Sequence, residues 1–151
     1  MTFASQIQAF AKKCDSLTTK VYQGSCHQIS EDIIEESPVS TGSLIGTWTP
    51  GIGSAESAFF KGGESAWVKG VKDEGIASAN RVPAMAYAGS KLATKIPLLS
   101  KKDEYHFTNN VPYIEQVEHT GWDNTDAYHM REKALVNWQL IVDTVANRLN
   151  K

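Results

Sequence analysis

Apolar residues recur every three or four positions near the N-terminus, and this spacing predicts a long amphipathic helix over residues 2–36. Gly24 interrupts the pattern and could kink or divide the helix, because glycine costs about 1 kcal/mol relative to alanine inside a helix. The acidic residues after Ser30 suggest a second helix that begins there, since acids favour a first turn. Pro38 then ends the element. The apolar stripe consists of Phe3, Ile7, Phe10, Cys14, Leu17 and Val21, followed by Ile29, Ile33 and Ile34.

The C-terminal residues show the second strong helical period. We expect Asp123 or Asp126 to cap the start of this helix. Because the two terminal stripes are the largest apolar surfaces of the chain, we expect the terminal helices to pack together or on the same sheet. The C-terminal stripe contains Ala127, Met130, Ala134, Trp138, Ile141, Val145 and Leu149, widened by Leu135 and Val142.

Between the terminal helices, the pattern predicts short strands and a third helix. Leu44, Gly46 and Trp48 alternate with Ser43, Ile45 and Thr47 and indicate a strand entered from a turn at 41–42. A helix is expected over 80–96, with Asn80 as its N-cap, Pro83 in its first turn and Pro97 as its stop. Its expected buried face comprises Val82, Met85, Ala86, Leu92, Ala93 and Ile96.

A second short strand is expected around Tyr105–Phe107, ending at Asn109 and Asn110. Strands and helices do not alternate regularly, so a parallel sheet is not indicated. The order of elements predicts an α+β fold: long terminal helices packed on a small, mainly antiparallel sheet with a third helix. With 151 residues, the chain fits a single domain over 1–151.

Residues 51–79 are rich in glycine and also carry large apolar side chains, namely Phe59, Phe60, Trp67 and Val68. Ordering such a segment costs about 1–2 kcal/mol per residue in backbone entropy, yet a free loop leaves its aromatic rings exposed. Two interpretations remain open. The segment is either an arm that folds against a neighbouring subunit, which makes these four residues a candidate assembly interface, or a hairpin packed on its own core.

Composition and motifs argue against several functional classes. The net charge of −2 is unlike that of a strongly basic nucleic-acid-binding protein. No apolar run approaches the ~18 residues that span a bilayer, and no secretory signal is recognisable. Cys14 and Cys26 on one helix would lie ~18 Å apart, which is too far for a disulfide. We therefore expect two small buried thiols.

Chemistry-bearing motifs are equally scarce. The sequence contains no GxSxG, GxGxxG, CxxC or HExxH pattern. Asp123, Asp126 and His129 could hold a metal ion, but acids at a helix start explain the two aspartates more simply. We therefore expect no catalytic residue, no metal and no cofactor, and no enzymatic activity.

The segment 61–104 holds eight basic and five acidic residues, and is the basic part of the chain. Lys91, Lys95, Lys101 and Lys102 could form a solvated face or contact a nucleic acid or an acidic partner.

Two segments resemble the tail-completion and head–tail joining proteins of tailed bacteriophages, the family of the lambda minor tail protein Z. Residues 37–48, SPVSTGSLIGTW, resemble the family pattern P-V-D-T-G-x-L-x-x-S/N-W, with Ser40 in place of Asp. Residues 107–122 resemble I-x-N-N-x-P-Y-x-x-x-L-E-x-G-W, with one additional residue at 119–120, and 124–130 depart from the run that follows. The motif positions, read as scaffold, are Pro38, Thr41, Gly42, Leu44, Trp48, Asn109, Asn110, Pro112, Tyr113, Glu118, Gly121 and Trp122.

The resemblance implies a structural virion protein at the neck, made in the host cytoplasm, that completes or caps the tail and joins it to the head. It implies a ring of identical copies, expected to be a hexamer, around the DNA channel. Its neighbours would be the tail tube or tail terminator and the head connector. Genomic DNA would pass through the channel without sequence-specific binding, and no membrane would be involved. A tail terminator is the alternative within this class. A small nucleic-acid-binding or regulatory module is the alternative from another class.

Overall fold

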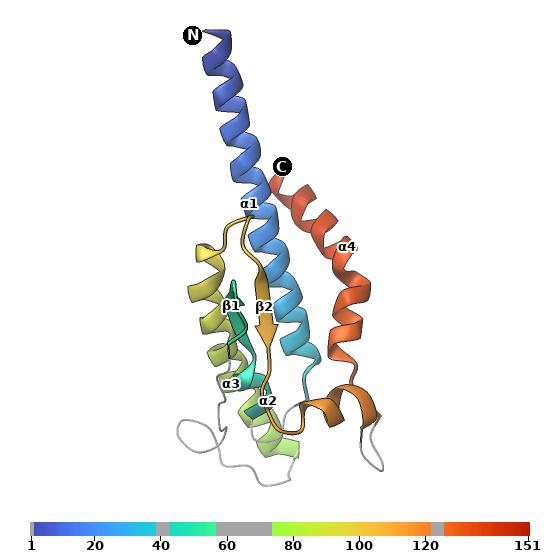
Figure 1. Cartoon of the computed structure of the whole chain (residues 1–151). Helices are drawn as coiled ribbons and strands as arrows, with labels where there is room; N and C mark the ends of the chain where they lie inside the picture. Colours follow the sequence, from blue (N-terminus) through green and yellow to red (C-terminus); the bar gives the residue numbers. More distant parts are fainter. Residues whose placement is uncertain (1, 39–42, 57–73, 122–125) are drawn as a thin grey trace.

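The computed structural model describes residues 2–38, 43–56, 74–121 and 126–151, without the side chains of 74–80. Two long helices dominate it: α1 (Phe3–Glu36) and α4 (Met130–Leu149). They pack against each other in antiparallel directions, as the two terminal stripes predict, and the N-terminal half of α1 projects beyond the rest of the molecule (Figure 1).

On the other side of α1 lie a two-stranded antiparallel sheet and α3 (Figure 1). Strand β1 (Thr49–Ile52) pairs with β2 (Tyr105–Thr108), with Thr49 opposite Thr108. The fold class is α+β, as expected. The remaining elements are α2 (Ser43–Thr47), α3 (Glu74–Lys95), a 3-10 turn η1 (Ile96–Leu98) and a π-helical turn η2 (Gln116–Thr120).

Helix α1 is continuous through both Gly24 and Ser30, so the expected division of this element is wrong. At Gly24, a Cβ atom would lie only 2.7 Å from Cγ1 of Val145 on α4, so glycine is present because the two helices approach closely there. Ser30 stays helical: its hydroxyl lies 2.7 Å from the carbonyl oxygen of Cys26 and from the hydroxyl of Tyr105. Cys26 is buried but Cys14 is exposed, so only one thiol fits the expectation of two buried ones.

The expected strand through Leu44 and Trp48 is also wrong, because residues 43–47 form α2 and the strand starts at Thr49. Residues 44–50 are all buried. A segment enclosed on every side has no alternation of polar and apolar faces, so its period does not reveal its backbone conformation.

Helix α3 begins at Glu74, not near residue 80, which places Pro83 inside the helix rather than in its first turn. Its buried face is a stripe of fourfold spacing: Ala84, Ala88, Leu92 and Ile96. Val82, Ala86 and Ala93 are exposed, contrary to expectation. Pro97 follows the last α-helical residue closely, as predicted, and lies in η1.

Helix α4 buries Met130, Ala134, Ile141 and Val145, in agreement with its predicted stripe. Leu135 and Leu149 do not belong to the buried stripe, because they are 64% and 38% exposed. His129 precedes the helix in the left-handed backbone region, with φ of 49°, and its side chain makes no capping bond.

No helix in the described part of the chain combines the length and the apolar content that crossing a bilayer requires.

Replacing Gly24 by alanine should destabilise the protein by up to about 2 kcal/mol, because an overpacked contact with Val145 outweighs the gain in helix propensity. Val145 cannot easily move aside, since a β-branched side chain in a helix has one preferred rotamer. Gly89 on α3 is the matched control: nothing lies within 4 Å of the position that a Cβ atom would take there, so Gly89→Ala should stabilise by up to about 1 kcal/mol. Urea unfolding measures both, and an equal stabilisation by the two substitutions would contradict the close approach.

Candidate assembly scaffold and interface

The two segments that carry the family resemblance meet in the fold. The Asn109 side chain donates a 2.7 Å hydrogen bond from Nδ2 to the carbonyl oxygen of Leu44. The rings of Trp48 and Phe107 are stacked with their centroids 5.0 Å apart. Asn109 also accepts a hydrogen bond from the backbone of Val111, which turns the chain after β2. Residues about sixty positions apart thus form one structural unit around the β1–β2 pair.

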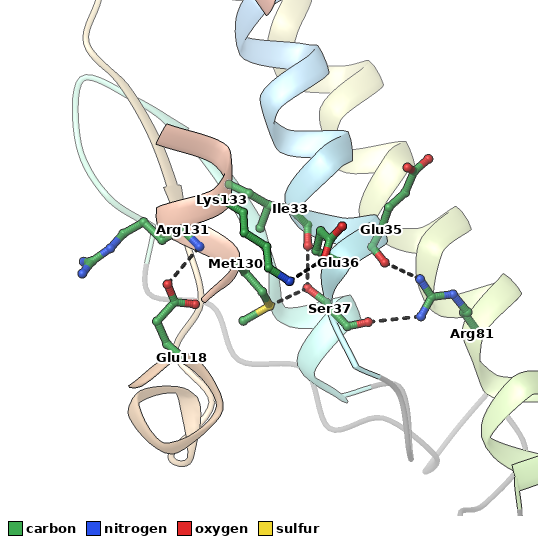
Figure 2. Close-up of polar contacts among 9 residues, drawn as sticks. All are labelled: Ile33, Glu35, Glu36, Ser37, Arg81, Glu118, Met130, Arg131 and Lys133. Carbon is green, nitrogen blue, oxygen red and sulfur yellow. Dashed lines mark hydrogen bonds and ion pairs between the residues drawn. The ribbon is translucent and has the colours of Figure 1, made fainter. Parts of the chain in front are cut away.

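Ser37 occupies the centre of a buried junction, which we call the Ser37 junction and define as Ser37, Ile33, Trp48 and Met130. Trp48 donates from Nε1 to the Ser37 hydroxyl over 2.9 Å. The same hydroxyl lies 2.7 Å from the carbonyl oxygen of Ile33 and 3.1 Å from the sulfur of Met130, and only 1% of Ser37 is exposed (Figure 2). One small side chain therefore joins the end of α1 to the start of α4 and to the residue between α2 and β1.

Arg81 of α3 completes the C-terminal end of α1. Its guanidinium donates to the carbonyl oxygens of Glu35 and Ser37 (Figure 2). Those carbonyls have no partner within the helix and form the negative end of its dipole, so a cation there is stabilising. Lys133 of α4 adds an ion pair with Glu36 at 3.0 Å, which is half exposed and therefore contributes little.

Glu118 caps the N-terminus of α4. Its Oε1 accepts a 2.9 Å hydrogen bond from the backbone N–H of Arg131, and only 7% of the residue is exposed (Figure 2). A carboxylate at a helix N-terminus satisfies a free N–H group and complements the helix dipole. The sequence prediction of an aspartate cap was wrong for Asp126, which is exposed and makes no such bond; Asp123 lies outside the described residues.

Other motif positions have scaffold roles of different kinds. Gly121 is buried with φ of 68°, a backbone conformation that favours glycine, and its N–H donates to Gln116 to close η2. Asn110 donates to the carbonyl oxygen of Glu56 over 3.1 Å. Pro112 and Tyr113 are exposed, and Pro38 is partly buried.

Several of the residues singled out from the sequence lie outside the described part of the chain. These are Thr41, Gly42 and Trp122 of the motifs, and Phe59, Phe60, Trp67 and Val68 of the candidate interface. Of the segment 51–79, the first two residues belong to β1 and the last six to α3. The proposed roles of its central residues stay predictions.

The basic stretch is largely engaged with its own chain. Lys91 donates from Nζ to the carbonyl oxygen of Gly46 over 2.8 Å and to the hydroxyl of Thr49 over 3.1 Å. Burial lowers the pKa of Lys91 to about 8. Lys95 lies 3.5 Å from the carboxylate of Glu56, and Lys101 forms an ion pair with Asp15. These contacts leave less free positive charge for phosphate groups than the sequence suggests.

Two apolar faces are exposed, one on each terminal helix. On α1, Phe3, Ile7 and Phe10 are 77%, 51% and 69% exposed. On α4, the exposed set is Leu135, Val136 and Leu140. Solvent-facing apolar residues that gather on one helix face, rather than scattering singly, are typical of interaction surfaces.

A cleft of about 520 Å³ also lies between α1 and α4, lined by Leu17, Thr18, Val21, Tyr22, Ser25, Trp138, Val142 and Asn150. Within the ranges that the structure describes, no three histidine, cysteine, aspartate or glutamate side chains gather in a way that could hold a metal ion.

Sequence reasoning missed Ser37 and Arg81 as structural residues. Ser37 carried a usable signal, since a small polar residue between a helix end and a proline is well placed to bond the helix carbonyls. Arg81 carried none, because its partners are backbone atoms some 45 residues away.

Comparisons of this chain with protein-family models, with curated proteins and with solved structures find no match.

Ser37→Ala should destabilise the protein by about 1–3 kcal/mol, because it leaves the buried N–H of Trp48 without its acceptor. Trp48→Phe removes that N–H, so the loss caused by Ser37→Ala should be smaller in the Trp48→Phe background. Urea unfolding of the four proteins of this double-mutant cycle measures the coupling. A coupling near zero would exclude the Ser37 junction as a cooperative unit.

Lys91 should make the stability rise with pH. Between pH about 8 and 10.5, the unfolded chain binds a proton at Lys91 that the folded chain has released, so the free energy of unfolding increases with pH. The window for the measurement is pH 7.5–9, because burial raises the pKa of Cys26 to about 12 and ionisation of that thiol in the unfolded chain acts in the opposite direction above pH 9.

In urea unfolding, Lys91→Met should lose the rise between pH 7.5 and 9, whereas the control Lys102→Met, at an exposed position, should keep it. If the free energy of unfolding of the Lys91 variant still rose with pH as in the natural protein, the rise could not be assigned to Lys91.

Proposed function

We propose that the chain is a structural virion protein of a tailed phage, which completes or caps the tail at the neck and joins it to the head as a ring around the DNA channel. The observation that supports this best is the union of the two family-like segments: Asn109 bonds Leu44, and Phe107 stacks on Trp48. Two parts of one scaffold are expected to lie together in the fold, and these two segments do.

The roles of the motif residues are consistent with a scaffold. Trp48 and Glu118 form structural hydrogen bonds, and Asn109 fixes a chain turn. None of these side chains is placed to make or break a covalent bond of a substrate. Side chains that hold the protein's own shape are consistent with a role in assembly, in which surfaces rather than reactive groups make the contacts.

The exposed apolar faces of α1 and α4 supply such surfaces. A cyclic ring with head-to-tail contacts needs two different patches on each subunit, and these helices carry one each. The basic stretch gives little support to the alternative of a nucleic-acid-binding module, because Lys91, Lys95 and Lys101 contact their own chain.

The direct test is removal of the gene from the phage that encodes the chain, followed by electron microscopy of the lysate. We expect separate heads and tails that the purified protein restores to joined particles, and an antibody to the chain should label the neck. Normal particles without the protein would refute the proposal. A steep decrease of DNA-duplex affinity with salt in the purified protein would instead support the nucleic-acid module.

A further inference from the structure

The exposed apolar residues of α1 belong to a seam that α4 already covers in part. Phe3, Ile7, Phe10 and Cys14 follow one another at spacings of four, three and four, which is the pattern of a coiled-coil seam. Leu17 and Val21 continue it into the cleft against Trp138 and Val142 of α4. The seam becomes uncovered where α4 ends at Leu149, and α1 continues alone (Figure 1). The exposed part is thus the continuation of an existing helix–helix interface.

Helix α4 carries a second apolar face, opposite to the one that packs on α1. Val136 is 83% exposed, and Leu135 and Leu140 flank it at 64% and 66%. Glu132 and Asp143 lie on the same side, one at each end, since positions 132, 136, 139, 140 and 143 share one face of a helix. This face therefore carries Val136, Leu140 and the polar Gln139 in its middle and an acid at each end.

The two surfaces carry complementary charges. The α1 seam spans eleven steps of a helix from Phe3 to Cys14, about 16 Å, whereas the apolar residues of the α4 face span five steps, from Leu135 to Leu140, with an acid beyond each end. Lys13 flanks the α1 seam at its Cys14 end, whereas the α4 face offers the carboxylates of Glu132 and Asp143. Pairing the α1 seam with the α1 seam of another copy in the parallel direction would bring Lys13 alongside Lys13, which is unfavourable.

We propose that the exposed α1 seam, Phe3, Ile7, Phe10 and Cys14, packs on the α4 face, Leu135, Val136 and Leu140, of a second copy of this chain. Because each subunit has one seam and one face, the contact is head to tail and repeats from copy to copy. The proposal deepens the proposed function, on which its closure into a ring rests, by naming the subunit contact. The contact itself is a property of the isolated protein.

Two double variants test the contact, each with glutamates on one surface only. The seam variant is Ile7→Glu with Phe10→Glu, and the face variant is Val136→Glu with Leu140→Glu. Since all four positions are exposed, both variants should keep the circular dichroism and urea midpoint of the natural protein. The matched control is Val82→Glu with Leu98→Glu, at two similarly exposed apolar positions outside both surfaces.

Analytical ultracentrifugation over a range of concentrations gives the readout. The natural protein and the control should self-associate alike, and each variant alone should associate at least tenfold more weakly. An equimolar mixture of the two variants should form a dimer that grows no further, because only one intact seam and one intact face remain.

Several results would overturn the proposal. A monomeric natural protein, or a mixture that forms no dimer, would exclude the contact. Association of the face variant alone would show pairing of α1 with α1, and association of the seam variant alone would show pairing of α4 with α4. Because this test uses the purified chain, its failure leaves the neck assignment standing, and failure of the neck assignment leaves this contact standing.

Discussion

The close crossing of α1 and α4 determines most of the architecture. At Gly24 the absence of a side chain allows Val145 to reach the backbone of α1, and this approach sets the path of α4 along its neighbour. The Ser37 junction fixes the same pair at its other end, where Met130 and Trp48 meet one hydroxyl. Two small residues therefore position two long helices, and the sheet and α3 fill the opposite side of α1 (Figure 1).

Capping groups from distant segments complete this arrangement. Arg81 of α3 satisfies carbonyls at the C-terminal end of α1, and Glu118 satisfies the backbone N–H of Arg131 in the first turn of α4. Each helix end is thus stabilised by a residue from another element, so the ends become stable only when the tertiary fold has formed. Such mutual dependence favours cooperative unfolding of α1, α3 and α4.

The terminal helices and the α+β class could be predicted from the sequence, because long stripes with apolar residues every three or four positions indicate amphipathic helices. The stripe on α4 named Met130, Ala134, Ile141 and Val145 correctly. Periodicity fails where burial removes the polar–apolar contrast, as in α2, and where tertiary contacts decide, as at Gly24. The motif residues were recognised by resemblance, but their bonding partners, such as Leu44 for Asn109, depend on chain topology that a linear pattern does not contain.

The projecting half of α1 has a thermodynamic consequence of its own. An isolated helix of this length is marginal in water because its first turn is costly to form. Here that cost does not arise, since the packed residues around Cys26 and Ser30 already provide a formed helix from which the exposed turns propagate one residue at a time. The projecting turns therefore fray from Phe3 inwards rather than melt as a unit, and any molecule that covers them extends the ordered helix by propagation alone.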